Sequence, residues 1–114
     1  MKNAKIVTYL GFSIRARKIV FGVDEIEAIR KGAYLLIADG GLGASSFKTL
    51  VKASEKLACP LLITEAGALG EHLQRPAVKA VALKEKNLAA AILSEVASTQ
   101  YWKIYSEINS GGNN

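Results

Sequence analysis

Residues Arg15–Ile26 read RARKIVFGVDEI and pass from the cationic end of a helix through a short strand into a second helix. Ile19–Phe21 is β-branched and aromatic, which is typical of a strand, and Gly22 marks its end. Asp24 and Glu25 suit the first turn of the next helix, because carboxylates stabilise the positive end of a helix dipole. This stretch therefore predicts the helix–strand–helix alternation on which the rest of the fold is built.

The same alternation continues on both sides of this stretch. Upstream, Ile6, Leu10 and Ile14 have the spacing of one helix face, which predicts a helix over residues 4–18. Downstream, Tyr34–Ala38 is a continuous apolar run, typical of a strand that is covered on both faces. Further helices are predicted over 24–30, from Ser45 or Ser46 to 57, within 65–74 and from Asn87 onward, with further strands at 61–64 and 78–83.

The chain has 114 residues, which is the size of one ordinary domain. Helices that alternate with short apolar strands predict an α/β/α sandwich, in which a mixed sheet of about four strands lies between helices. The core of this single domain is expected over about 5–97. The polar, glycine-rich end 110–114 is expected to be flexible.

An aromatic segment follows the last predicted helix. Tyr101, Ile104, Tyr105 and Ile108 continue a helical stripe, which predicts a C-terminal helix extension to about residue 108. Together with Trp102, this stripe either packs against the domain or provides the contact of a weak homodimer.

Composition restricts where the protein acts. No stretch approaches the roughly 20 apolar residues that are needed to span a bilayer, and the polar N-terminus does not resemble a signal peptide. The single cysteine, Cys59, has no partner for a disulfide, which favours a reducing compartment. We therefore expect a cytoplasmic protein without membrane contact.

The catalytic inventory is small. His72 is the only histidine and Cys59 the only cysteine, so neither a nucleophile–base pair nor a metal-ligand set is apparent. We expect no enzyme activity, no catalytic residue, no metal and no cofactor. One alternative remains, because the glycine-rich turn Asp39–Ser46 lies between a strand and a helix, where backbone N–H groups can hold the phosphate of a nucleotide. That turn lacks the lysine of a P-loop.

The charge balance favours a polyanionic partner. Fifteen Lys and Arg residues against ten Asp and Glu residues give a formal charge of +5, which suits nucleic acid. Cations on either side of the Gly22 turn would bind phosphates, and the acidic pair Asp24 and Glu25 would accept hydrogen bonds from base edges. The candidate phosphate-binding residues are Arg15, Arg17, Lys18 and Lys31.

Several motifs resemble the L-seven-Ae and L-thirty-e ribosomal protein superfamily. The run Gly22–Ile26, followed by Ala28–Gly32 and the strand Leu35–Asp39, is similar to the Gly-x-Asn-Glu-Val signature of that family and its surroundings. Leu10–Gly22 resembles the first helix and strand of the bacterial members. Pro60–Ile63 and Ala68–Glu71 resemble the third strand and the Leu-Gly start of the following helix, so the resemblance extends over residues 5–97.

The resemblance implies an α/β/α sandwich that binds structured RNA, typically a kink-turn and in some members ribosomal RNA, without catalysis. It implies that Gly22, Asp24 and Glu25 face the sheared G·A pairs, and Val23 between them is included among the RNA-binding residues. The loop after the fourth helix, residues 74–78, would cover the flipped-out nucleotide and tune specificity, with three residues nominated as RNA contacts. These are Gln74, Arg75 and Pro76.

Two positions depart from the family pattern. Asp24 stands where asparagine is usual, and Ala28 stands where kink-turn binders carry a lysine. The alternative that these departures leave open is a protein-interaction or scaffold module that keeps the fold without the RNA specificity.

Overall fold

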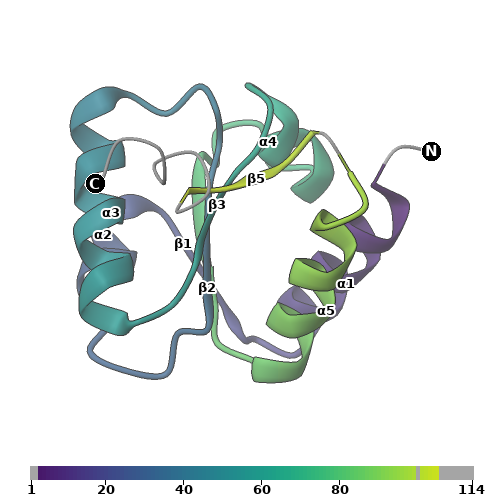
Figure 1. Cartoon of the computed structure of the whole chain (residues 1–114), viewed down its shortest axis with the longest axis horizontal. Helices are drawn as coiled ribbons and strands as arrows, with labels where there is room; N and C mark the ends of the chain where they lie inside the picture. The colour runs from purple at the N-terminus through teal and green to yellow at the C-terminus, as the bar shows by residue number, and fades with distance from the viewer. Residues whose placement is uncertain (1–2, 100, 106–114) are drawn as a thin grey trace.

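The computed structural model describes residues 3–99 and 101–105 as helices alternating with short strands (Figure 1). The elements in chain order are α1 (Ala4–Arg15), β1 (Ile19–Phe21), α2 (Val23–Glu27), β2 (Leu35–Ala38), α3 (Ala44–Leu57), β3 (Leu61–Ile63), α4 (Ala68–Leu73), β4 (Ala80–Leu83), α5 (Lys86–Val96) and β5 (Lys103–Ile104). The sheet lies between α2 and α3 on one face and α1, α4 and α5 on the other, as the predicted sandwich requires.

Within the described residues the sheet has five strands in the order β1-β4-β2-β3-β5, one more than the sequence predicted. Strands β2 and β3 are parallel, whereas β4 pairs antiparallel with both β1 and β2. Since β4 runs against its two neighbours, β1, β2 and β3 all end at the same edge of the sheet. We call this edge the carboxyl edge; it is the upper edge in Figure 1.

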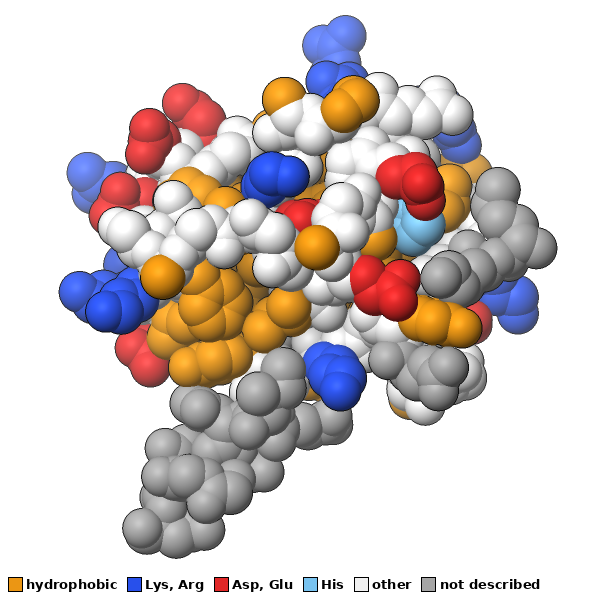
Figure 2. Space-filling model, turned by 90° about the horizontal axis from the view of Figure 1, so that it is seen from above, with side chains coloured by type: hydrophobic (Ala, Val, Ile, Leu, Met, Phe, Trp, Pro, Cys, Tyr) orange, Lys and Arg blue, Asp and Glu red, His pale blue; other side chains and the backbone are white. Residues whose placement is uncertain are grey.

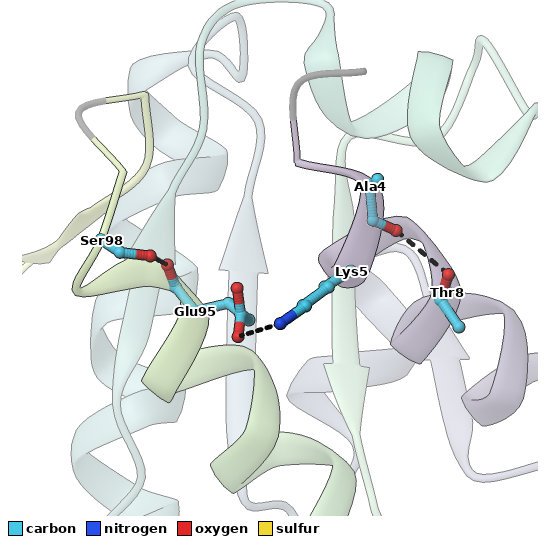
Figure 3. Close-up of polar contacts among 5 residues, drawn as sticks. All are labelled: Ala4, Lys5, Thr8, Glu95 and Ser98. Atoms are coloured by element: carbon cyan, nitrogen blue, oxygen red, sulfur yellow. Dashed lines mark hydrogen bonds and ion pairs between the residues drawn. The ribbon is translucent and has the colours of Figure 1, made fainter.

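The core has two parts because strand side chains alternate between the two faces of the sheet. Leu35 and Ile37 face α1 and α5, and Leu36 and Ala38 face α2 and α3. All four are fully buried, which confirms that the apolar run forms a strand covered on both faces. On the first face α1 packs along α5, where Lys5 Nζ lies 3.9 Å from Glu95 Oε2 (Figure 3). This exposed ion pair contributes little beside the apolar packing.

The first two helices end earlier than predicted. Helix α1 ends at Arg15 and not at Lys18, because Arg17 adopts a left-handed conformation with φ of 57°. Helix α2 ends at Glu27 and not at residue 30, yet Ile29 beyond its end remains buried. The apolar spacing in the sequence extends past the end of the helix, because Ile29 in the loop is buried in the same core as Ile26.

The predicted N-caps are also wrong. Neither Ser45 nor Ser46 caps α3, which begins at Ala44 after Gly43. Helix α5 begins at Lys86, one residue before Asn87, and Glu85 is its N-cap, since its carboxylate accepts a hydrogen bond of 2.6 Å from the Leu88 N–H. Helix α3 begins without a side-chain cap, and in α5 the Glu85 carboxylate makes the capping hydrogen bond that was expected of Asn87.

The predicted aromatic helix extension is wrong over residues 101–104. Residues Lys103–Ile104 form β5, which pairs antiparallel with β3 through Leu62↔Ile104. Trp102 is 2% exposed within the core, stacked on His72 with ring centroids 5.8 Å apart. Packing against the domain is therefore confirmed for Trp102, and this residue is not available for the dimer contact. Ile108 and the tail 110–114 lie outside the described residues.

Candidate nucleic-acid interface

The carboxyl edge brings together two of the segments that the sequence nominated. Gly22 follows β1 at this edge, where its N–H donates to the Ala80 carbonyl oxygen at 2.9 Å. The Arg75 guanidinium carbon lies 4.6 Å from the centre of the Phe21 ring, within the range of a cation–π contact. Arg75 therefore contacts the residue that directly precedes Gly22, although the two segments are far apart in the sequence.

The backbone conformation of Gly22 leaves open space beside residues 22–25. Gly22 has φ of 93°, a conformation that side-chain-bearing residues rarely adopt, and nothing lies within 4 Å of where a Cβ would be. Val23 is half-buried and begins α2, and Asp24 and Glu25 in the first turn are exposed. Both carboxylates are therefore accessible from solvent, where they can accept hydrogen bonds from a ligand.

Close packing positions the second segment. A Cβ on Gly70 would lie 2.9 Å from the Arg75 carbonyl oxygen, so α4 can approach the loop only because this residue is glycine. The Arg75 N–H donates to the Gly70 carbonyl oxygen at 2.9 Å, and Gln74 adopts a left-handed φ of 56° to begin the loop. Gln74, Arg75 and Pro76 are all exposed.

Arg15 is the last residue of α1. Its side chain turns back along the helix, with a guanidinium carbon 4.9 Å from the centre of the Phe12 ring. It lines a shallow groove between α1 and α4 that Gln74 also lines. Arg15 is therefore the one predicted phosphate-binding cation that shares a described groove with Gln74.

The other three predicted cations lie at the opposite end of the sheet. Arg17 and Lys18 precede β1, and Lys31 lies in the loop that leads into β2. Gly22 is four positions after Lys18 along an extended strand, a distance of about 13 Å. The sequence joined these residues to Asp24 and Glu25 because they are close along the chain, whereas the strand between them carries them to opposite edges.

Asp39 organises the centre of the carboxyl edge and was not nominated from the sequence. Its buried carboxylate accepts hydrogen bonds from the N–H groups of Gly41 at 2.8 Å, Gly67 at 2.9 Å and Leu69 at 3.1 Å. Burial alone would raise the pKa of this carboxyl, but these hydrogen bonds and nearby Lys79 lower it below the ordinary value. Asp39 thus joins the loop after β2 to the start of α4.

This arrangement disfavours the phosphate site considered for the glycine-rich turn. One of its N–H groups, that of Gly41, is already used by the Asp39 carboxylate. A phosphate at that position would meet a like charge that is held ionised. Gly40 has a packing role, since a Cβ there would lie 2.5 Å from the Thr64 carbonyl oxygen.

Charges of both signs surround the carboxyl edge. Viewed from above, much of the middle of this face is backbone and uncharged polar side chains or glycine, drawn in white, with a hydrophobic patch beside it and basic and acidic side chains around both (Figure 2). Lys79 is a cation at this edge that the sequence did not single out, and its ammonium lies 3.9 Å from the position of a Cβ on Gly41. Its position depends on the pairing of β4 with β2, which no local pattern reveals.

The described residues contain no group of three or more His, Cys, Asp or Glu side chains that could hold a metal ion. Burial raises the pKa of the half-buried Cys59 thiol, which makes the reactive thiolate form less accessible. In the part of the chain that the structure describes, no helix is long and apolar enough to cross a membrane.

The geometry defines a three-layer α/β/α domain with a five-stranded mixed sheet in its described residues. Among solved structures, the chain is similar to a protein of unknown function from Bacillus halodurans, with a TM-score of 0.69 and 18% sequence identity. The match covers 82% of this chain and 98% of that one, and it shows a shared fold. No protein-family model matches the chain, and the search of curated proteins gave no match.

Proposed function

We propose that this is a cytoplasmic, non-catalytic protein that binds structured RNA of the kink-turn type at the carboxyl edge. The observation that carries the proposal is the contact between Arg75 and Phe21, the residue directly before Gly22. Asp24, Glu25 and Arg75 are all exposed, so their charged groups are accessible to a ligand. The resemblance to the L-seven-Ae and L-thirty-e superfamily nominates the same two segments. Three kinds of group at this surface suit RNA: exposed carboxylates, an arginine and an open backbone.

Each kind of group has a distinct task. Glu25 and Asp24 accept hydrogen bonds from guanine N–H groups. A carboxylate can therefore select a base, because the phosphates of RNA have no N–H group to donate. Arg75 and Arg15 contact phosphates on either side of those bases. Gly22 allows the RNA to approach the backbone closely, because no side chain stands between them.

Asp24 and Ala28 change the balance from that of a typical kink-turn binder. Asp24 is exposed and adds a negative charge close to where phosphates would lie, and the exposed Ala28 supplies no cation. Under this proposal, base selection depends mainly on Glu25 and phosphate affinity mainly on Arg75. Both dependences are stronger than in a typical kink-turn binder, which has the asparagine and the lysine as well.

A titration of labelled kink-turn RNA and a control hairpin at fixed salt tests this function. The wild-type protein should bind the kink-turn more tightly. Glu25→Gln should weaken kink-turn binding about tenfold, since one good base contact contributes about 1–3 kcal/mol. The matched control is Glu55→Gln, an exposed change of the same kind on α3, which should bind as the wild type does.

Arg75→Gln gives a second readout. Loss of one phosphate contact should lower the slope of log affinity against log salt by about 0.9 on a duplex, whereas Lys52→Gln on the outer face of α3 should not change it. No binding of either RNA at micromolar protein would refute the proposal. Equal binding of both RNAs would show that affinity comes from charge alone.

A further inference from the structure

A basic surface lies at the end of the sheet opposite the carboxyl edge. Its lining consists of four cations with one glycine and one tyrosine, and no acidic residue lines it. We call this surface the basic hollow, formed by Arg17, Lys18, Lys31, Gly32, Tyr34 and Lys84. All six residues are exposed, so the cations are accessible to a partner.

The backbone under the basic hollow is held by the sheet. The Lys84 N–H donates to the Lys18 carbonyl oxygen at 2.8 Å, and the Tyr34 N–H donates to the Leu83 carbonyl oxygen at 2.9 Å. The first bond continues the ladder of β1 with β4 by one residue, and the second joins Tyr34 to the last residue of β4. Lys18, Lys84 and Tyr34 therefore lie side by side at the ends of three neighbouring strands, about 4.8 Å apart from one strand to the next.

This arrangement places like charges opposite each other. The register that pairs Ile19 with Leu83 brings Lys18 opposite Lys84, and like charges at opposite positions destabilise a sheet. Among residues 3–99 and 101–105, none of the four cations forms an ion pair. Glu85, which directly follows Lys84 in the sequence, uses its carboxylate to cap α5. A bound anion would relieve the repulsion.

Tyr34 adds a second kind of recognition. Tyr34 is 41% exposed, although it directly precedes a fully buried strand. An exposed aromatic ring beside several cations suits a ligand that carries both a phosphate and a flat base. A simple anion would use the cations and leave the ring without a role.

We propose that the basic hollow is a second nucleic-acid site, which binds single-stranded RNA. Lys18, Lys84, Arg17 and Lys31 contact successive phosphates, and Tyr34 stacks on one base. This site differs from the carboxyl edge in ligand and in residues. A stacking contact of this kind accepts any base, so the site requires an unpaired strand and no particular sequence.

The test uses fluorescently labelled oligouridine about ten nucleotides long, within the usual site size for single strands. Binding is followed by anisotropy over a series of salt concentrations. The double variant Lys18→Gln/Lys84→Gln should bind at least tenfold more weakly, and the slope of log affinity against log salt should fall by about 1.4. The control is Lys48→Gln/Lys52→Gln on α3, which changes the net charge equally and should retain affinity and slope.

Two variants of Tyr34 test the stacking contact. Tyr34→Ala should weaken oligouridine binding about fivefold or more, whereas Tyr34→Phe should keep it, because the ring is what stacks. Thermal unfolding of each variant confirms that the fold is intact. These residues are exposed, so the folded state should be retained.

Three results would overturn the proposal. These are absence of oligouridine binding at low salt, an equal loss of affinity in the α3 control, and unchanged binding by Tyr34→Ala. The outcome is separable from that for the carboxyl edge, because Glu25→Gln should weaken kink-turn binding and leave oligouridine binding unchanged.

Discussion

Replacing Asp39 with asparagine tests how the carboxyl edge is assembled. One carboxylate oxygen, Oδ2, accepts from the N–H groups of Gly41 and Gly67, and Oδ1 accepts from Leu69 N–H at 3.1 Å and from Thr64 Oγ1 at 3.4 Å. Asparagine has a single acceptor oxygen. Whichever way its amide is oriented, the amino group faces donors that it cannot satisfy.

The expected loss follows from the bonds that are broken. A hydrogen bond to a charged group contributes about 1.5–3 kcal/mol, and Asp39→Asn sacrifices two of these acceptor contacts. Gly41 and Gly67 are exposed, so water replaces part of what is lost. The free energy of unfolding should therefore fall by about 2–4 kcal/mol, a large share of the roughly 5–15 kcal/mol that is typical of a domain.

The effect should depend on pH in a defined direction. The folded-state pKa of Asp39 lies below its ordinary value of 3.8, so its stabilising contribution is present above that value. It is lost as the pH falls through the folded-state pKa, where the carboxylate becomes protonated. The difference in stability between the wild type and Asp39→Asn should thus be largest near neutral pH and shrink in acid.

Urea unfolding followed by the fluorescence of Trp102, the only tryptophan, measures both quantities. Glu55→Gln is the control, because it neutralises an exposed carboxylate on α3 and should change stability by no more than about 0.5 kcal/mol. The reasoning is refuted if Asp39→Asn is as stable as this control at neutral pH. A stability difference that grows on acidification would refute it equally.

Three further comparisons test the packing by urea unfolding, followed by circular dichroism so that the Trp102 variants can be measured as well. Trp102→Ala should lower stability by about 3–5 kcal/mol, and Trp102→Phe by much less, because the buried indole Nε1–H has no partner among the described residues; equal losses would contradict this. Gly40→Ala should lower stability, because its Cβ would lie 2.5 Å from the Thr64 carbonyl oxygen. Gly43→Ala should be tolerated, because the space around Gly43 is open and its φ of −64° suits any residue. If Gly43→Ala were the less stable of the two, the described loop would be wrong. Glu85→Ala should cost about 1 kcal/mol by removing the cap on Leu88 N–H, and an unchanged midpoint would reject that cap.

Local patterns were sufficient to predict the central elements of the fold. Leu35–Ala38 is recognisable because an uninterrupted apolar run of this length needs cover on both faces, and its four residues are buried. Alternation of such runs with helical spacing then predicts helices on both sides of a sheet. The three layers observed confirm that prediction.

The fifth strand was beyond local patterns. Strand β5 has only two residues and exists because Ile104 pairs with Leu62 in β3. Its aromatic and aliphatic residues are spaced as in a helix, so periodicity favoured the wrong element. Long-range pairing decided the outcome, as is common for short edge strands.

The candidate surfaces were predictable in part. The resemblance nominated residues 22–25 and 74–76, and the structure places Arg75 in contact with Phe21, the residue directly before Gly22. No sequence pattern placed Lys84 beside Lys18, because that neighbourhood depends on β4 lying between β1 and β2. Proximity along the chain also grouped Lys18 with Glu25, which the extended strand separates.

Chemical-shift mapping of isotope-labelled protein with kink-turn RNA tests the central claim most directly. The account predicts that the backbone amides of residues 22–25 and of Gln74 and Arg75 shift together, with those of α3 as an internal control. RNA that shifts neither segment, or shifts only amides remote from the carboxyl edge, would contradict the account.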